Sequence, residues 1–262
     1  MTALQRFNTV WISDVHLGTR ACRVDLLLDF LKRTQCKKLY LVGDIVDLER
    51  LRRSFFWPQS HTEVLRTLLK KCQQGTEVIY IPGNHDDDFR AMAGQRLGPI
   101  DVRRRDIHVT EDGRRLLVLH GDEFDGLLKS PSLSNIAGGI AYSGLLMLNR
   151  LMHWWHEVRG LPYWSLAQHV KTRIGKAVRY VENFQRACIR AARDEKVDGV
   201  VCGHIHQATI VEEDGFTYCN DGDWVESCTA AVEKDDGSLE LIAWSDTREN
   251  VATDAIPLRD AA

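Results

Sequence analysis

Five short clusters of aspartate, asparagine and histidine occur along the chain, and each directly follows an apolar segment. Carboxylate, imidazole and amide groups are the ligands that manganese, iron, zinc or magnesium ions take in proteins, and no thiolate in these clusters competes with them. Any one cluster alone is compatible with an ordinary turn. The five together predict a metal centre. They are Asp14-Val15-His16, Gly43-Asp44-Ile45-Val46-Asp47, Gly83-Asn84-His85-Asp86, His120-Gly121-Asp122 and Gly203-His204-Ile205-His206.

The spacing inside two clusters suits metal ligation. On an extended segment, residues i and i+2 point the same way, so Asp14 and His16 could bind one ion. His204 and His206 have the same spacing and could each reach a different ion. Two neighbouring cations activate water and neutralise charge on a phosphoryl group. The clusters therefore predict a hydrolase of phosphoester or phosphoanhydride bonds.

Alternating strands and helices must position these clusters. Apolar periodicity predicts strands at 9–13, 38–42 and 77–82, with helices at 22–35 and 61–74 between them. Such units form a parallel or mixed sheet with helices on its faces, and ligands bind outside the carboxyl ends of its strands. We therefore expect all five clusters to meet at one rim. Further strands are expected at 107–110, 115–119, 199–202, 209–212, 216–220, 228–233 and 239–244.

The segment 125–195 has a different pattern, mostly helical, and we expect a single domain over 1–262 with this segment inserted as a helical cap. Its uncharged run at 136–148 is too short to span a membrane, which takes about 20 residues. Trp154, Trp155 and Trp164 lie close by, and Arg150 to Lys196 carries a net charge of +6. These features suit an anionic substrate or an interfacial helix, or else a packed hairpin with a solvated basic face.

The composition narrows the function classes. The 262 residues have a net charge of −3, which gives no whole-chain polycation for nucleic acid. The seven cysteines form no CxxC pair, so neither a zinc knuckle nor a disulfide framework is expected. The N-terminus has no long apolar signal region. We expect a cytoplasmic protein, with peripheral contact with the inner membrane if the cap is interfacial.

The set of clusters resembles the signature of the calcineurin-like metallophosphoesterase superfamily. The resemblance implies an α/β fold, a four-layer sandwich of two mixed sheets flanked by helices. It also implies two divalent metal ions. The implied ligands of one ion are Asp14, His16, Asp44 and His206, and those of the other are Asp44, Asn84, His120 and His204. The implied catalytic residues are His85 and Asp47. His85 contacts the scissile phosphate or protonates the leaving oxygen, and Asp47 orients the His85 ring.

Within that superfamily the chain resembles the UDP-2,3-diacylglucosamine pyrophosphohydrolase group of lipid A biosynthesis. The shared features are Ser13 to Gly18, the strand end at 41–44, His120-Gly121-Asp122 and a basic, apolar insertion before the last histidine pair. The resemblance implies cleavage of a UDP pyrophosphate to a lipid monophosphate and UMP, usually with manganese. Two departures point to a paralogue with another substrate. His85 stands where defined members have arginine, and the residues after Asp122 differ from the usual pattern.

Three residues are expected to contact substrate, namely Arg20, Asp86 and Asp122. The expected partner is an anionic lipid-linked nucleotide or another phosphorylated small molecule, and no nucleic acid. The alternatives are a metallophosphodiesterase of a different lipid-linked or small substrate, a nuclease, and a non-catalytic binding scaffold on the same fold. The net charge and the lack of interleaved base-stacking aromatics weigh against a nuclease, and the complete ligand set with His85 weighs against a scaffold.

Overall fold

The computed structural model describes residues 4–126 and 166–244. The chain divides into two compact units, one made of Met1–Phe124 with Gln185–Ala262 and the other of Asp125–Phe184. The expectations for the apolar run at 136–148 and for the three tryptophans of the cap fall outside the described residues. The last part of the predicted insertion is described, and it forms helix α5 (Leu166–Asp194).

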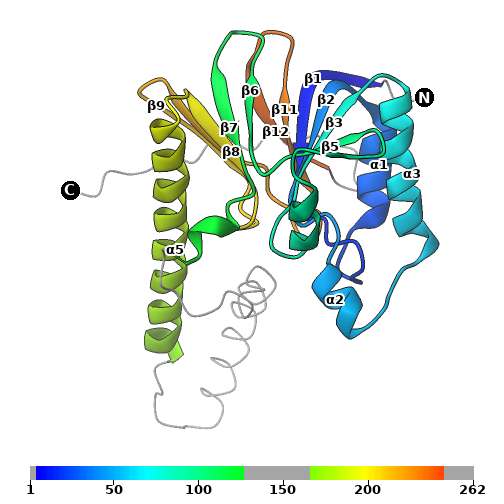
Figure 1. The fold of residues 1–262 in the computed structure, drawn as a ribbon. Coiled ribbons are helices and arrows are strands. Elements are labelled where there is room, and N and C mark those ends of the chain that lie inside the picture. Colours follow the sequence, from blue (N-terminus) through cyan, green and yellow to red (C-terminus); the bar gives the residue numbers. More distant parts are fainter. Residues whose placement is uncertain (1–3, 127–165, 245–262) are drawn as a thin grey trace. The chain divides into compact units, whose positions relative to one another are not determined.

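A seven-stranded mixed sheet combines β1 to β5 with β11 and β12 from a later part of the chain (Figure 1). Strands β1, β2, β3 and β5 are parallel to one another, while β11, β12 and β4 run antiparallel to their neighbours. The strand order is β12-β11-β1-β2-β3-β5-β4. The bounds are β1 Gln5–Ile12, β2 Thr34–Val42, β3 Glu77–Ile81, β4 Arg96–Leu97, β5 Ile100–Val102, β11 Thr229–Glu233 and β12 Leu239–Ala243.

A second, five-stranded sheet has the order β6-β7-β8-β10-β9. Its three central strands are parallel, and β6 and β9 pair antiparallel at the edges. The two mixed sheets with flanking helices confirm the fold class expected from the sequence. The bounds are β6 Asp106–Val109, β7 Arg115–Val118, β8 Gly199–Cys202, β9 Thr209–Glu213 and β10 Phe216–Asn220.

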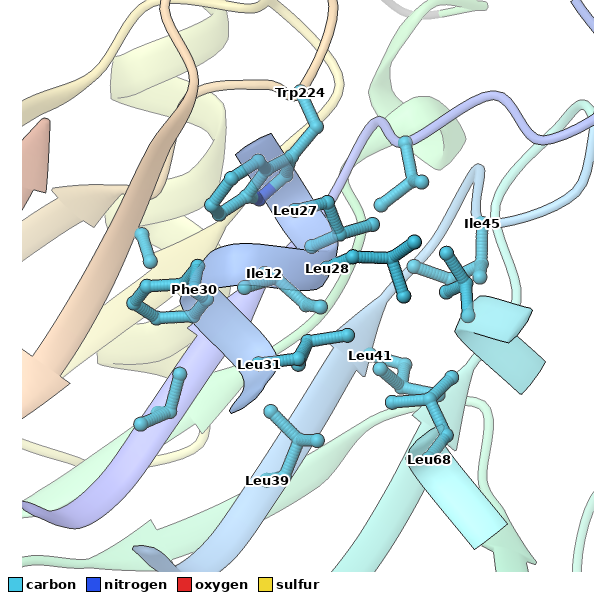
Figure 2. Close-up of a cluster of buried hydrophobic side chains, with 14 of the residues drawn as sticks. Ile12, Leu27, Leu28, Phe30, Leu31, Leu39, Leu41, Ile45, Leu68 and Trp224 are labelled. Atoms are coloured by element: carbon cyan, nitrogen blue, oxygen red, sulfur yellow. The ribbon is translucent and has the colours of Figure 1, made fainter. Parts of the chain in front are cut away.

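Helices α1 (Val24–Arg33) and α3 (Gln59–Gln73) pack on the outer face of the first sheet. Figure 2 shows Leu31 of α1 beside Leu39 and Leu41 of β2, with Leu27 and Leu28 of the same helix in the same cluster. Burying a leucine contributes roughly 1.5–3 kcal/mol, so this layer fixes the helices against the strands. Short helical segments complete the described elements, namely α2 Leu48–Arg53, η1 Asp87–Met92 and η2 Asp122–Phe124.

The two sheets share a second hydrophobic core. Trp11 and Tyr40 of the first sheet belong to the same buried cluster as Leu116 and Val118 of the second. The period-2 alternation of β1 explains the division, because Trp11 points to this cluster while its neighbours Val10 and Ile12 point to the helices. The alternation thus makes one strand contribute to both cores.

Most predicted elements are confirmed with shifted ends. The first strand begins at Gln5 rather than at residue 9, and the helix expected at 22–35 is shorter, because its last two residues begin β2. Helix α2 and strands β4 and β5 were not predicted. They are two to six residues long, too short to show a hydrophobic period. Among residues 4–126 and 166–244, no helix has the length and apolarity to cross a membrane.

Candidate metal centre

The predicted clusters all lie in loops that begin at the carboxyl ends of strands, three of which (β1, β2 and β3) are in the first sheet and two (β7 and β8) in the second, so two sheets share the rim that the sequence assigned to one. The structure brings their donor atoms together in groups whose members lie within 4.8 Å of one another. Asp14 and His16 follow β1, Asp44 and Asp47 follow β2, Asn84 and His85 follow β3, His120 follows β7, and His204 and His206 follow β8.

The first donor group consists of Asp14, His16 and His206. The Nε2 atom of His206 lies 3.1 Å from Oδ1 of Asp14, and Nε2 of His16 lies 4.0 Å from the same oxygen. The two histidine rings stack with centroids 5.5 Å apart. One carboxylate oxygen and two ring nitrogens therefore face a common point, as in a metal-binding site.

The second donor group consists of Asp44, His120 and His204. Oδ2 of Asp44 lies 3.5 Å from Nε2 of His120. The same oxygen lies 4.0 Å from Nε2 of His16, which belongs to the first donor group. Its other oxygen accepts a hydrogen bond from the backbone N–H of His85 at 2.9 Å. Asp44 is thus turned so that one oxygen faces both groups, the placement that a bridging ligand requires.

Asp47 lies between two histidines and offers one oxygen to each. Its Oδ2 is 3.3 Å from Nδ1 of His16, and its Oδ1 is 3.3 Å from Nδ1 of His85. Asp47 is also the N-cap of α2, where it accepts the backbone N–H of Arg50. Both rings thus face Asp47 with Nδ1 and the donor groups with Nε2. Nε2 of His85 and Nε2 of His16 each lie 4.0 Å from Oδ2 of Asp44. About 30% of the His85 side chain is exposed, so a substrate can reach it.

The side chain of His120 supports a metal ion as the missing partner. Its Nδ1 lies 2.8 Å from the carbonyl oxygen of Val42, which accepts its proton. The buried Nε2 atom has no hydrogen-bond partner among the described residues. Buried polar atoms are nearly always satisfied, and a metal-ligating histidine typically donates its other ring N–H to a carbonyl or carboxylate. The residues present therefore fit a divalent cation.

The carboxylates also make this region favourable for positive charge. Burial opposes a charge on His206, but Asp14 outweighs it and raises the pKa of that ring to about 9. The adjacent Asp47 carboxylate raises the pKa of His85 to about 9 as well. Carboxylates that draw protons onto neighbouring rings attract a bound cation for the same reason.

Backbone strain is concentrated at the same residues. A positive φ is uncommon for a residue with a side chain and persists where the surrounding structure enforces it, often at functional sites. Five members of the two donor groups adopt it, with φ of 49° at Asp14, 53° at His16, 53° at Asp44, 71° at His204 and 54° at His206.

The loop glycines leave room for these side chains. A Cβ atom at Gly83 would lie 2.3 Å from Oδ1 of Asp44 and 2.7 Å from Nε2 of His120. We expect Gly83→Ala to displace both side chains and to weaken Mn²⁺ binding roughly 10- to 100-fold, the usual effect of disturbing the support of metal ligands. A titration followed by calorimetry measures this, with Gly126→Ala as the control because nothing lies within 4 Å of its Cβ position. Equal affinity in the two variants would contradict the prediction.

Ser13 and Asp221 support Asp14 and were not expected from the sequence. The Ser13 hydroxyl lies 2.5 Å from Oδ2 of Asp14 and 2.6 Å from Oδ1 of Asp221, and the backbone N–H of His204 donates to that Asp14 oxygen at 2.8 Å. Oδ1 of Asp14 is thereby left for the first donor group. A signal was present, since Asp221 directly follows the apolar strand β10 just as the five clusters follow theirs.

The other predicted site residues lie around the donor groups. Asn84 is exposed in the loop after β3. Arg20 is exposed and stacks over the ring of Phe56 at 5.1 Å. Both oxygens of Asp122 accept hydrogen bonds from Arg90, at 2.7 and 2.8 Å. Asp86 is fully buried, and its oxygens accept backbone N–H groups.

Comparisons of sequence and of structure show which known proteins this chain resembles. The family model described as calcineurin-like phosphoesterase matches residues 7–208. A curated relative from Neisseria gonorrhoeae, named UDP-2,3-diacylglucosamine hydrolase, is 26% identical over 87% of this chain and 95% of its own length. A relative of the same name from Haemophilus influenzae is 24% identical over the same shares. Among solved structures, the phosphoesterase Yfce from E. coli is 16% identical, with a TM-score of 0.46 over 94% of this chain and 99% of that one.

Proposed function

The chain belongs to the calcineurin-like phosphoesterase family and is a metal-dependent phosphoesterase, and from this premise we propose that it is a two-metal hydrolase of a UDP-diacylglucosamine-like lipid nucleotide. The observation that carries the two-metal part is the single oxygen of Asp44 that faces both donor groups. The names of the curated relatives support the substrate.

In this proposal one cation is held by the first donor group with Asp44, and the other by the second donor group with Asn84. When bound, the cations supply Lewis acidity at the phosphoryl oxygens and lower the pKa of water. Manganese is proposed first because of the family resemblance, while iron, zinc and magnesium suit the same oxygen and nitrogen donors.

His85 is the proposed proton donor to the leaving oxygen. Its Nε2 faces the donor groups, its side chain is accessible, and Asp47 holds its Nδ1 at 3.3 Å. The Asp47 carboxylate raises the pKa of His85 and so favours the protonated ring, the form that can give up a proton. Hydrolysis then adds water across one P–O–P linkage and releases a lipid monophosphate and UMP.

Contact with a lipid-bearing substrate at the inner membrane surface is part of the proposal. Arg186 and Arg190 are exposed on α5, one helical turn apart, and suit an anionic substrate or an anionic lipid surface. His85, in place of the arginine of the defined group, favours a second candidate, a metallophosphodiesterase of another lipid-linked or small phosphodiester.

The test is cleavage by the manganese-loaded protein, comparing UDP-2,3-diacylglucosamine with bis(p-nitrophenyl) phosphate. We expect selective cleavage of the lipid nucleotide, measured as UMP release. Cleavage of the small diester alone would contradict the proposed substrate while leaving the two-metal chemistry in place. A protein that binds no metal and cleaves neither compound would be a binding scaffold, and the whole proposal would be wrong.

A further inference from the structure

Asp86 is a fully buried carboxylate that joins two loops of the metal centre. Its Oδ2 accepts the backbone N–H groups of Ile45 at 2.7 Å and Val46 at 3.2 Å. Its Oδ1 accepts those of Gly83 at 2.6 Å and Asp44 at 3.3 Å. Three of these donors belong to the loop after β2 and one to the loop after β3, so a single side chain fixes both loops.

The burial of this carboxylate has an energetic cost that the N–H groups offset. A charge taken out of water is unfavourable unless hydrogen bonds or an opposite charge compensate it. Four N–H dipoles aimed at two oxygens provide that compensation. The arrangement leaves no exposed surface on Asp86 for the substrate contact expected from the sequence, so the side chain acts on its own backbone surroundings.

The two loops carry different parts of the chemistry. The loop after β2 contains Asp44, and the loop after β3 contains Asn84 and His85. They also meet directly, because the N–H of His85 donates to Oδ1 of Asp44 at 2.9 Å, and the N–H of Leu48 donates to the carbonyl of His85 at 3.0 Å. A change in the separation of the loops would therefore turn the Asp44 carboxylate.

We propose that Asp86 is a positioning residue that holds the Asp44 carboxylate in the orientation shared by the two donor groups. The proposal rests on the two-metal function proposed above and adds a residue whose effect passes through the backbone. The neighbouring carboxylate of Asp87 is exposed, so it provides a matched control one position away.

Asp86→Asn is a sharp test because asparagine has the size and shape of aspartate but replaces one carboxylate oxygen with an NH₂ group. Each oxygen of Asp86 accepts two N–H groups, so an asparagine NH₂ would face two donors whichever way the amide is turned. We expect Mn²⁺ affinity to fall roughly 10- to 100-fold, as for other partners of metal ligands, while Asp87→Asn keeps the affinity of the unchanged protein.

Three measurements on the full chain separate positioning from a purely structural role. Calorimetry gives the number and affinity of bound Mn²⁺ ions. Electron paramagnetic resonance distinguishes two exchange-coupled ions from isolated ones, and we expect the coupled spectrum to be lost in Asp86→Asn. With bis(p-nitrophenyl) phosphate at saturating Mn²⁺, kcat is expected to fall while KM stays within about twofold, because orientation of the ligands and not substrate binding has changed.

A folded Asp86→Asn protein with unchanged Mn²⁺ affinity and a coupled spectrum would overturn the proposal, even if its melting temperature were lower. If Asp86→Asn does not fold, the same measurements on Asp86→Ser decide, because serine removes the carboxylate without directing an NH₂ group at the donors. Fewer than two Mn²⁺ ions in the unchanged protein and in Asp87→Asn would overturn the two-metal function itself, and the role of Asp86 with it.

Discussion

Asp44→Ala is expected to abolish turnover and to leave the protein unable to hold two metal ions. Oδ2 of Asp44 lies within 4.0 Å of ring nitrogens from both donor groups, so the substitution removes an oxygen from each proposed site. Cations stabilise the phosphoryl transition state by several kcal/mol, so activity should fall by roughly a thousandfold or more. Steady-state kinetics with bis(p-nitrophenyl) phosphate and elemental analysis of bound metal measure the two effects.

Asp44→Asn is the matched control for loss of fold. The amide oxygen can still accept the N–H of His85, whereas the negative charge is lost. We expect this variant to melt cooperatively and to bind metal more weakly than the unchanged protein, with activity between that of the unchanged protein and that of Asp44→Ala. Two bound metals and turnover within tenfold of normal in Asp44→Ala would show that Asp44 does not bridge.

His85→Ala should lower kcat by about 10²- to 10⁴-fold on diphenyl phosphate, whose phenolate leaving group is strongly basic, the usual range for loss of a general acid, with metal content near normal. The expectation follows from its position, since Asp47 holds one ring nitrogen and the other faces the donor groups. A leaving group that departs readily as an anion needs little protonation. The loss on bis(p-nitrophenyl) phosphate should therefore be much smaller.

The comparison of the two substrates separates the two roles that the family resemblance implies for His85. Equal losses on both substrates would indicate that the ring contacts the scissile phosphate rather than the leaving oxygen. His85→Gln is an informative second variant, because its amide can donate a hydrogen bond but cannot release a proton. Full turnover by purified His85→Ala, with metal bound, would rule out both roles.

The places of the candidate metal-site residues at the ends of strands could be predicted from the local sequence. Each cluster directly follows a short apolar segment, and these segments are the strands β1, β2, β3, β7 and β8. Local alternation is sufficient to predict such strands, and parallel pairing aligns the carboxyl ends of β1, β2 and β3 in one sheet and those of β7 and β8 in the other. Asp221 shows the limit of that approach, since it also follows a strand but belongs to no cluster with a recognisable spacing.

The roles of the individual carboxylates depended on contacts between distant residues. Asp86 and Asp122 looked equally suited to bind a substrate, but one accepts N–H groups from a loop some 40 residues away, and the other pairs with Arg90. The contacts of Asp86 follow from the pairing of β2 with β3, and the pair of Asp122 with Arg90 joins a loop of the second sheet to one of the first, and a linear pattern contains neither.

The sequence by itself determined the strand ends that carry aspartate and histidine, because apolar periodicity and residue type are local properties. The resemblance carried by those clusters implied the family and, with it, the two mixed sheets. Only the tertiary structure decided that one oxygen of Asp44 faces both donor groups, that Asp47 lies between two histidines and that Asp86 is buried. The physical reason is that hydrogen bonds and metal ligation require atoms within a few ångströms, and the close packing of strands from opposite parts of the chain sets those distances.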